Sequence, residues 1–151
     1  MSSPVVSIRP VEDDDLPIFL THQEDPVASA MAAFPTRTPE AFYEHFALIR
    51  ANPTNYIRTI LAGDIVVGDI MSWVHEGERE VGYWIGRDHW GRGYATAALR
   101  LLLAEIAERP IVAHVALDNI GSRRVLEHCG FTVADEAVAE DGVHERILRL
   151  D

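Results

Sequence analysis

The segment 81–107 constrains the fold more than any other part of the chain, because it combines a strand, a tight turn and a helix. The predicted strand is 81–85, Val-Gly-Tyr-Trp-Ile, and the turn after it contains Gly91 and Gly93. Beyond the turn, the apolar residues recur at steps of three and four: Ala95, Ala98, Leu99, Leu102, Leu103 and Ile106. This spacing predicts a helix with one side packed against a sheet.

The turn has the features of an anion-binding site. Gly91 and Gly93 allow backbone conformations that a Cβ would forbid, and they let a ligand approach the main-chain N–H groups. Those groups lie at the positive end of the helix dipole, which suits a phosphate, and Arg87 and Arg92 add positive charge beside them. The glycines alone are also consistent with a strand-to-helix turn that binds no ligand.

Two common nucleotide-binding motifs do not fit this turn. The dinucleotide pattern G-x-G-x-x-G needs a third glycine where this chain has Thr96. The P-loop needs Gly-Lys followed by Ser or Thr, and the chain contains no lysine. A nucleotide-binding regulatory domain is therefore not supported.

Two longer segments point to a known family. Residues 80–86 (EVGYWIG) and 90–96 (WGRGYAT) resemble the acetyl-CoA-binding segment of the GNAT N-acetyltransferases. Residues 119–131 (NIGSRRVLEHCGF) look like the Asn-x-x-Ser…Gly-Phe segment of one branch, the ribosomal-protein N-terminal acetyltransferases and their small bacterial relatives. The two motifs have the expected order and separation, and the resemblance covers residues 5–150 roughly, most strongly after Glu80.

The resemblance implies a GNAT fold of the α/β (α+β) class, with a mixed, mostly antiparallel sheet flanked by helices. The sheet is expected to splay between its fourth and fifth strands, with acetyl-CoA in the opening. Residues 1–151 are expected to form a single domain. Hydrophobic patterns predict strands at 5–10, 56–62, 65–74, 80–85, 111–117, 131–137 and 143–150, and helices at 39–52, 95–107 and 119–129. A further helix is expected to begin in the acidic run 12–15, with Leu16, Phe19 and Leu20 on its apolar side. Residues 25–38 are expected to be irregular with about one helical turn, and 75–79 a polar turn.

The resemblance also implies a set of cofactor-binding residues. The amides of 92–96 and the Thr96 hydroxyl would hold the pyrophosphate. Asn119 would bond the pantetheine arm, or serve only as a helix cap, and Arg123 would reach the phosphates, or be solvated. The full set is Trp84, Ile85, Arg87, Trp90, Gly91, Arg92, Gly93, Tyr94, Ala95, Thr96, Asn119, Ser122 and Arg123.

Acetyl transfer to an amine needs a donor for the oxyanion and a proton for the leaving thiolate. The backbone N–H of Ile85, on the splayed strand, is the predicted oxyanion donor. Much of the superfamily protonates the thiolate with a tyrosine whose position is occupied here by Leu126. Ser122 is the predicted replacement, since related members of the branch have a serine there, although an ordinary helix serine is the alternative. A second departure, Ala97 in place of the branch's usual glutamate, affects the region near the acceptor.

The amine must also be neutral when it attacks, which calls for a base. Glu80 is the predicted base because it lies on the splayed strand, while Asp69, His75 and a water relay are alternatives. Cys129 is adjacent to His128, but neighbouring helical residues point about 100° apart, so Cys129 is expected to pack rather than react.

Composition restricts the remaining choices. A net charge of −11 argues against nonspecific nucleic-acid binding and favours a cationic acceptor, although solubility alone also explains it. One cysteine excludes an internal disulfide, and the histidine spacing supports no metal site. No apolar run is long enough for a membrane span and no secretory signal is evident, so a cytoplasmic monomer or homodimer is expected.

We therefore expect an acetyl-CoA-dependent N-acetyltransferase that acts on a primary amine, either a protein N-terminus or a small molecule. The alternative is a GNAT-fold module that binds acyl-CoA without turnover, as a sensor or interaction partner. Leu126 favours that alternative, whereas Ser122 and the complete glycine turn oppose it.

Overall fold

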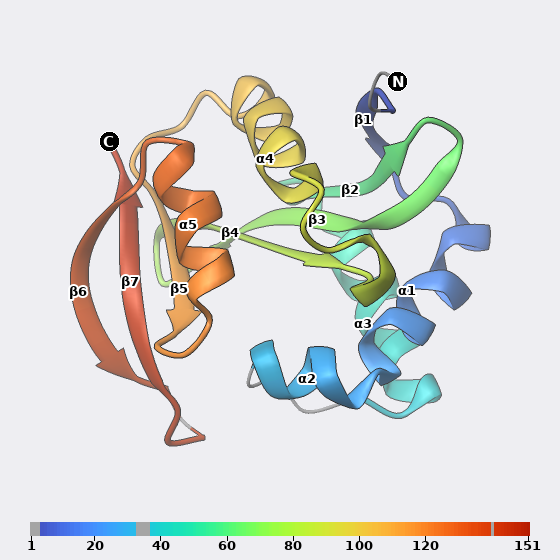
Figure 1. Ribbon diagram of the computed structural model, residues 1–151, viewed down its shortest axis with the longest axis horizontal. Coiled ribbons are helices and arrows are strands. Elements are labelled where there is room, and N and C mark those ends of the chain that lie inside the picture. Colours follow the sequence, from blue (N-terminus) through green and yellow to red (C-terminus); the bar gives the residue numbers. More distant parts are fainter. Residues whose placement is uncertain (1–3, 33–36, 140) are drawn as a thin grey trace.

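The computed structural model describes residues 4–32, 37–139 and 141–151. These residues form one seven-stranded sheet with helices on both faces (Figure 1). The strands are β1 (Val6–Pro10), β2 (Tyr56–Ala62), β3 (Ile65–His75), β4 (Glu78–Ile85), β5 (Ile111–Ala116), β6 (Thr132–Val138) and β7 (His144–Leu150). The α-helices are α1 (Leu16–Glu24), α2 (Pro26–Ala32), α3 (Pro39–Ala51), α4 (Tyr94–Glu105) and α5 (Ile120–His128), and the 3₁₀ turns are η1 (Asp13–Asp15) and η2 (Arg87–His89).

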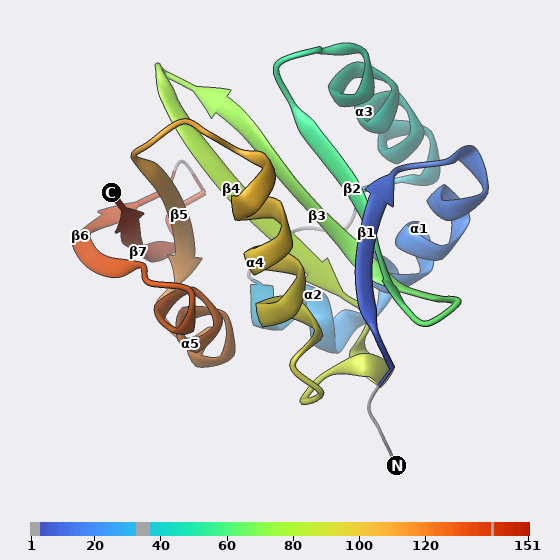
Figure 2. The same ribbon diagram turned by 90° about the horizontal axis from the view of Figure 1, so that it is seen from above.

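The strand order is β1-β2-β3-β4-β5-β7-β6, and every neighbouring pair is antiparallel except β4 and β5. Helices α4 and α5 lie on one face, and α1 and α3 lie on the other, as the two views show (Figure 1, Figure 2). The predicted mixed, mostly antiparallel sheet flanked by helices is confirmed.

Helix α4 buries the apolar stripe that its sequence predicts. Ala98, Leu99 and Leu102 are fully buried against the sheet, in one core with Ile70 and Leu148. Burial of a leucine side chain stabilises a fold by roughly 1.5–3 kcal/mol, so this stripe fixes α4 firmly over the central strands. The turn that precedes α4 is thereby held at one end of β4.

The sheet opens beside β4. The parallel pairing of β4 with β5 consists of two residue pairs, Arg79 with Ile111 and Glu80 with Val112. Beyond Glu80 the two strands separate, while β4 stays paired with β3 as far as Ile85. The splay between the fourth and fifth strands is therefore where the family resemblance predicts it.

A β-bulge in β3 lies next to this opening. Ile60 pairs with Gly68 and Leu61 pairs with Val66, which leaves Val67 as an extra residue. A Cβ on Gly68 would lie 2.1 Å from the carbonyl oxygen of Trp84, so only glycine fits where β3 passes this close to β4. Bulges bend a strand and strengthen its twist, and this one lies beside Ile85, at the open end of the splay.

Two predicted boundaries were wrong. Within 25–38, expected to be irregular with about one helical turn, residues 26–32 form the seven-residue helix α2; residues 33–36 lie outside the described residues. Pro26 at its first position and a hydrogen bond of 2.9 Å from the Val27 amide to Asp25 Oδ1 favour this helix. The predicted polar turn at 75–79 was too long, because β3 runs to His75 and β4 starts at Glu78.

Candidate functional site

The glycine turn leads directly into α4. Gly91 and Gly93 have φ of 73° and 77°, a left-handed conformation that side chains disfavour. A Cβ at either position would meet nothing within 4 Å, so backbone conformation rather than space explains these glycines. Gly93 is the N-cap residue, and the first-turn amides after it have no partner within the helix. The turn therefore offers several N–H donors at a positive helix end.

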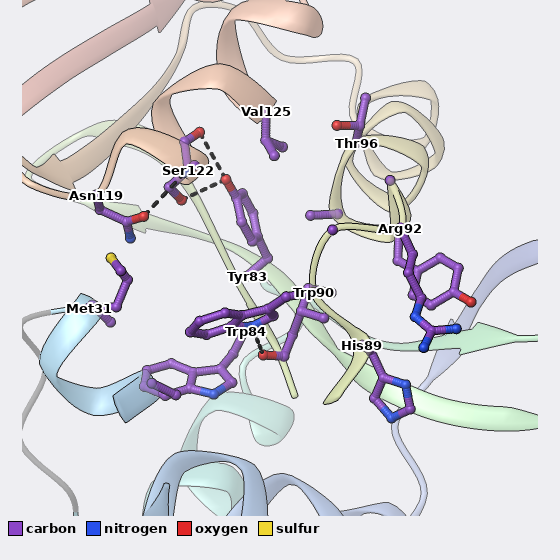
Figure 3. A pocket seen from close by; sticks show the side chains of 18 residues that line it. Met31, Tyr83, Trp84, His89, Trp90, Arg92, Thr96, Asn119, Ser122 and Val125 are labelled. Atoms are coloured by element: carbon purple, nitrogen blue, oxygen red, sulfur yellow. Dashed lines mark hydrogen bonds between the residues drawn. The ribbon is translucent and has the colours of Figure 1, made fainter. Parts of the chain in front are cut away.

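A cavity of about 380 Å³ lies between this turn, β4 and the start of α5 (Figure 3). Its walls bring together most of the residues predicted to bind the cofactor: Trp84, Ile85, Trp90, Gly91, Arg92, Gly93, Tyr94, Ala95, Thr96, Asn119 and Ser122. Helix α2 completes the wall with Ala28 and Met31, which the sequence did not single out.

Two predicted cofactor residues lie outside this wall. Arg87 forms an ion pair of 2.8 Å with Asp25, at the start of α2. Arg123 forms one of 2.8 Å with Glu127, four residues further along α5. The Arg123–Glu127 pair follows from its i, i+4 spacing on a helix, whereas only the fold brings Arg87 to Asp25. Contact of Arg87 or Arg123 with a cofactor stays a prediction.

The end of β4 presents a backbone amide to the opening. The Gly86 N–H donates to the Val67 carbonyl at 2.9 Å, and backbone groups alternate in direction along an antiparallel strand. The N–H of Ile85, which pairs with Gly68, therefore points away from β3 and toward the gap. The Ile85 carbonyl accepts a hydrogen bond of 2.8 Å from Trp90 Nε1, which fixes this end of the strand.

Ser122 is held from two directions. Its amide donates to Asn119 Oδ1 at 3.2 Å, so Asn119 caps α5. Its hydroxyl lies 2.7 Å from the hydroxyl of Tyr83, which also donates to the Ser122 carbonyl at 3.1 Å (Figure 3). Burial raises the pKa of Tyr83 to about 12, although the Ser122 hydrogen bond opposes the shift, so the phenol stays protonated at neutral pH.

Tyr83 was not among the predicted site residues. Strand alternation was the signal that could have found it, because Val81, Tyr83 and Ile85 share the face that packs toward α4 and α5. Leu126, where much of the superfamily has a tyrosine, is buried in the same core. A phenol therefore reaches Ser122 from the strand instead of from the helix.

A second cavity, of about 580 Å³, continues from the first toward α1 and α3. Tyr83, Trp84, Asn119 and Ser122 line both cavities. The two spaces therefore meet at the splay of the sheet. This arrangement allows two ligands to approach one point from different sides.

The predicted bases lie at different distances from this junction. Asp69 lines the second cavity, whereas Glu80 and His75 line neither. His114, which was not among the predicted bases, also lines the second cavity. Burial raises the pKa of Asp69 to about 7, against its own backbone hydrogen bond. Burial also raises the pKa of Glu80, which lies 3.6 Å from His114 Nε2, while that histidine opposes the shift.

The single cysteine of the chain lies against α4. Cys129 is half-buried with its Sγ 3.7 Å from the Thr96 carbonyl, and burial raises the pKa of the thiol, as expected for a packing role. No group of three or more His, Cys, Asp or Glu among the described residues is arranged to hold a metal ion. None of the described helices has the length and apolarity needed to cross a membrane.

Comparison with known proteins assigns the fold and the site to a family. Residues 6–132 match the family model of the acetyltransferase (GNAT) domain. The chain belongs to the GNAT acetyltransferase family. The match covers β1 to the start of β6, and it includes both cavities and the glycine turn.

Individual GNAT proteins agree with this assignment. YjcK of Bacillus subtilis, named as an N-acetyltransferase, is 32% identical over 108 residues, which cover 67% of this chain and 56% of that protein. YdaF of the same organism, named provisionally as a ribosomal N-acetyltransferase, is 34% identical over 76 residues, 48% of this chain and 40% of YdaF. This GNAT chain thus spans about half the length of these curated relatives, and YdaF supports the predicted branch.

The fold of this GNAT chain also matches solved structures. Spermidine N-acetyltransferase from Vibrio cholerae, solved with CoA and spermine, has a TM-score of 0.79 at 18% identity. The match covers 95% of this chain and 92% of that one. At this identity the likeness concerns the fold.

Proposed function

We propose that this protein moves the acetyl group of acetyl-CoA to a primary amine. The observation that carries the proposal is the junction of two cavities at the splay, with Tyr83, Trp84 and Ser122 lining both. A two-substrate transfer needs such a junction, because donor and acceptor must reach each other in the correct orientation. The solved spermidine N-acetyltransferase, which holds CoA and a polyamine, is consistent with this use of the fold.

Acetyl-CoA would occupy the first cavity. Its pyrophosphate would accept hydrogen bonds from the amides of 92–96, aided by Arg92 and the Thr96 hydroxyl. The pantetheine arm would run along the open edge of β4, with Trp84 and Trp90 at its sides. Asn119 uses Oδ1 to cap α5, so its amide nitrogen is the atom that would contact the arm.

The thioester carbonyl would then lie against the Ile85 amide. That N–H points into the opening and would stabilise the negative oxygen of the tetrahedral intermediate. As the C–S bond breaks, the Ser122 hydroxyl would donate to the leaving sulfur. Tyr83 acts as a positioning residue here, because its hydroxyl lies 2.7 Å from Ser122 Oγ and fixes the place of that oxygen. When the phenol donates to Oγ, the serine hydrogen is free to turn toward the leaving sulfur.

The predicted base, Glu80, would accept a proton only indirectly, through another group. Its carboxylate lies behind His114, whose Nδ1 is also 3.4 Å from Glu145. His114 lines the acceptor cavity and Glu80 does not, so any proton that Glu80 takes from the amine would pass through this imidazole or a water. The acceptor itself would be a protein N-terminus or a small-molecule amine.

A second candidate function is binding of acyl-CoA without turnover, and Leu126 is the observation that favours it. Two measurements separate the candidates. Acetyl-CoA should raise the melting temperature, since a ligand that binds only the folded state stabilises it. A panel of primary amines should then release CoA thiol. No thermal shift contradicts both candidates, whereas a shift without thiol release from any amine supports the non-catalytic module.

A further inference from the structure

We propose that Asp69 binds the ammonium group of the acceptor and takes its proton, and that the acceptor is a primary amine with an aromatic or branched apolar group. This inference rests on the proposed acetyl transfer and names the acceptor class of the same site. It assigns the proton-accepting step to a residue on β3 instead of to Glu80 on β4.

The position of Asp69 places it next to the reacting groups. It pairs across the sheet with Trp84, the residue that precedes Ile85. Facing residues in such a pair lie about 5 Å apart at their Cα atoms, with both side chains on the same face. The side chains of Asp69 and Trp84 both line the second cavity, and Trp84 also lines the first. Asp69 is therefore on the acceptor side of the splay, one residue from the predicted oxyanion donor.

Asp69 is buried without the partners that a structural carboxylate has. Asp69 is only 6% exposed. Within the described chain, its carboxylate has one hydrogen bond, which it accepts from its own backbone amide. Asp15 gives the contrast. It is 3% exposed, and it accepts hydrogen bonds from Arg9 at 2.6 and 2.9 Å, from Thr59 at 2.7 Å and from the Glu12 amide at 2.9 Å.

A buried carboxylate needs a cation or several hydrogen-bond donors to stay charged. Asp15 has these partners within the fold, because Arg9 contacts it directly. Asp69 instead faces a cavity that can admit a cation from a ligand. A ligand ammonium would complete the site, because it supplies three donors and a compensating charge. Burial keeps the pKa of Asp69 near 7, which suits a group that alternates between binding a proton and releasing it.

The other walls of the second cavity determine which group next to the ammonium of the acceptor fits. Its walls are mainly apolar and aromatic, with Trp73, Trp84 and Met71 from the sheet and Phe42 and Phe46 from α3. Such rings contact a neighbouring apolar group and also attract the cation. A volume of about 580 Å³ lies within the range of small-molecule pockets and admits a single large side chain together with its amine.

The absence of a side chain at Gly82 leaves space for the Trp73 indole, which forms one of these walls. A Cβ there would lie 3.0 Å from the Trp73 ring, so the indole packs directly over the strand at this point. The remaining titratable or charged side chains that line the described part of the cavity are Arg37 and His45 on the α3 side, Tyr83 from β4 and His114 from β5. None of these four is a carboxylic acid, which leaves Asp69 as the carboxylate lining the described part of the cavity.

The proton balance is simple. The ammonium gives one proton to Asp69, and the neutral amine attacks the thioester carbon, forming the C–N bond. When the C–S bond breaks, the Ser122 hydroxyl donates its proton to the leaving sulfur. Ser122 then takes the second proton from the nitrogen, which restores its hydroxyl. The products are the amide and CoA thiol, and Asp69 releases its proton to solvent.

The first experiment compares Asp69→Asn with Glu80→Gln and with Asp64→Asn, a control on the exposed β2–β3 turn. Asp69→Asn should lower kcat/KM at neutral pH on the order of 10²-fold and remove the rise of kcat/KM through pH 7. The acetyl-CoA thermal shift should persist in all variants, which separates a lost base from a lost fold. An unchanged pH profile in Asp69→Asn, or loss of that rise in Glu80→Gln instead, would overturn the assignment.

The second experiment tests the acceptor class by thiol release. The probes are 2-phenylethylamine, the peptide Phe-Ser-Ala, and their apolar-poor counterparts ethylamine, Gly-Ser-Ala and spermidine. At least one of the first two should exceed its counterpart and spermidine by on the order of 10-fold in kcat/KM, and the better one identifies a free amine or an N-terminus as the source. Spermidine or ethylamine as the best acceptor would overturn this inference while still establishing acetyl transfer. No release with any probe would contradict the proposed function itself.

Discussion

The hydroxyl of Tyr83 lies 2.7 Å from the hydroxyl of Ser122 and so joins β4 to α5 across the opening of the sheet. Strand β4 has lost its pairing with β5 at this point, and the Tyr83–Ser122 contact replaces it with a side-chain hydrogen bond. The bond lies where both cavities meet. This contact therefore bridges the splay and positions the hydroxyl of the predicted proton donor.

This relationship predicts a non-additive pair of variants. Ser122→Ala should lower turnover on the order of 10²-fold, since it removes the donor to the thiolate. Tyr83→Phe should lower kcat by a smaller factor, about 10-fold, with little change in the acetyl-CoA thermal shift. Because Tyr83 acts through Ser122, Tyr83→Phe should have almost no further effect in the Ser122→Ala background.

The measurement is a double-mutant cycle on kcat, with Tyr43→Phe on the exposed side of α3 as the control for loss of a phenol. A simple structural role for Tyr83 would slow the single and double variants by equal factors. Equal factors would therefore contradict the positioning role, and wild-type turnover in Ser122→Ala would make Ser122 a bystander.

The glycine turn predicts the effect of a charge at the phosphate site. Acetyl-CoA at one hundred times its Kd should stabilise the protein by about 2.7 kcal/mol. For a chain of this size that corresponds to a rise in melting temperature of roughly 5–10 °C. Gly93→Asp should abolish the rise, because it adds a negative charge beside the α4 amides and strains a position with φ of 77°.

Gly93→Asn is the matched comparison, since asparagine tolerates the left-handed conformation and adds no charge. It should keep most of the thermal shift if charge is the main cause. An undiminished shift in a folded Gly93→Asp variant would remove the turn from the binding site.

Part of this site was predictable because its signals are local in the sequence. The left-handed glycines, the α4 periodicity and the Asn119 cap each depend on residues within one or two helical turns, so the turn and both flanking elements were predicted correctly. The family motifs added the splay, which the two β4–β5 residue pairs confirm. Hydrophobic periodicity alone could not have placed it, since it does not report where two strands stop pairing.

The rest depends on contacts between distant segments. Tyr83 and Ser122 are 39 residues apart, and no local pattern shows that their hydroxyls meet. Asp15 and Asp69 both have an apolar neighbour in the sequence. In the fold, Arg9 neutralises Asp15, whereas Asp69 faces a cavity. Which arginine pairs with which carboxylate is decided by the tertiary fold, so the roles of buried charges could not be assigned from sequence.

Asp15 predicts how stability depends on pH. Burial alone would raise its pKa, but hydrogen bonds from Arg9, Thr59 and the Glu12 amide outweigh burial and lower the pKa to about 2. A carboxyl whose pKa is lower in the folded state stabilises the protein above its unfolded pKa, near 3.9, and loses that contribution as the pH falls toward 2. The contribution at neutral pH is on the order of 2 kcal/mol.

Chemical denaturation of wild type and Asp15→Asn at several pH values tests this contribution. The variant should be less stable at pH 7, and the difference in the free energy of unfolding should shrink between pH 4 and pH 2. Asp14→Asn, an exposed neighbour, should show no such difference. A gap between wild type and Asp15→Asn that stays constant down to pH 2 would contradict the assignment.

The bulge beside the splay predicts the last outcome. Gly68→Ala would place a methyl group 2.1 Å from the Trp84 carbonyl oxygen and 3.1 Å from the Ile85 Cα, both of which are backbone atoms that cannot rotate away. Strand β4 must then move, so the variant should lose about 1–3 kcal/mol of stability, the usual effect of an overpacked site. The same movement shifts the Ile85 amide, so kcat should fall even at a temperature where the variant is fully folded. Gly121→Ala is the stability control, because its Cβ meets nothing within 4 Å and alanine favours the helix by about 0.5–1 kcal/mol. If Gly68→Ala were as stable and as active as wild type, the close approach of β3 to β4 would have no part in positioning the oxyanion donor.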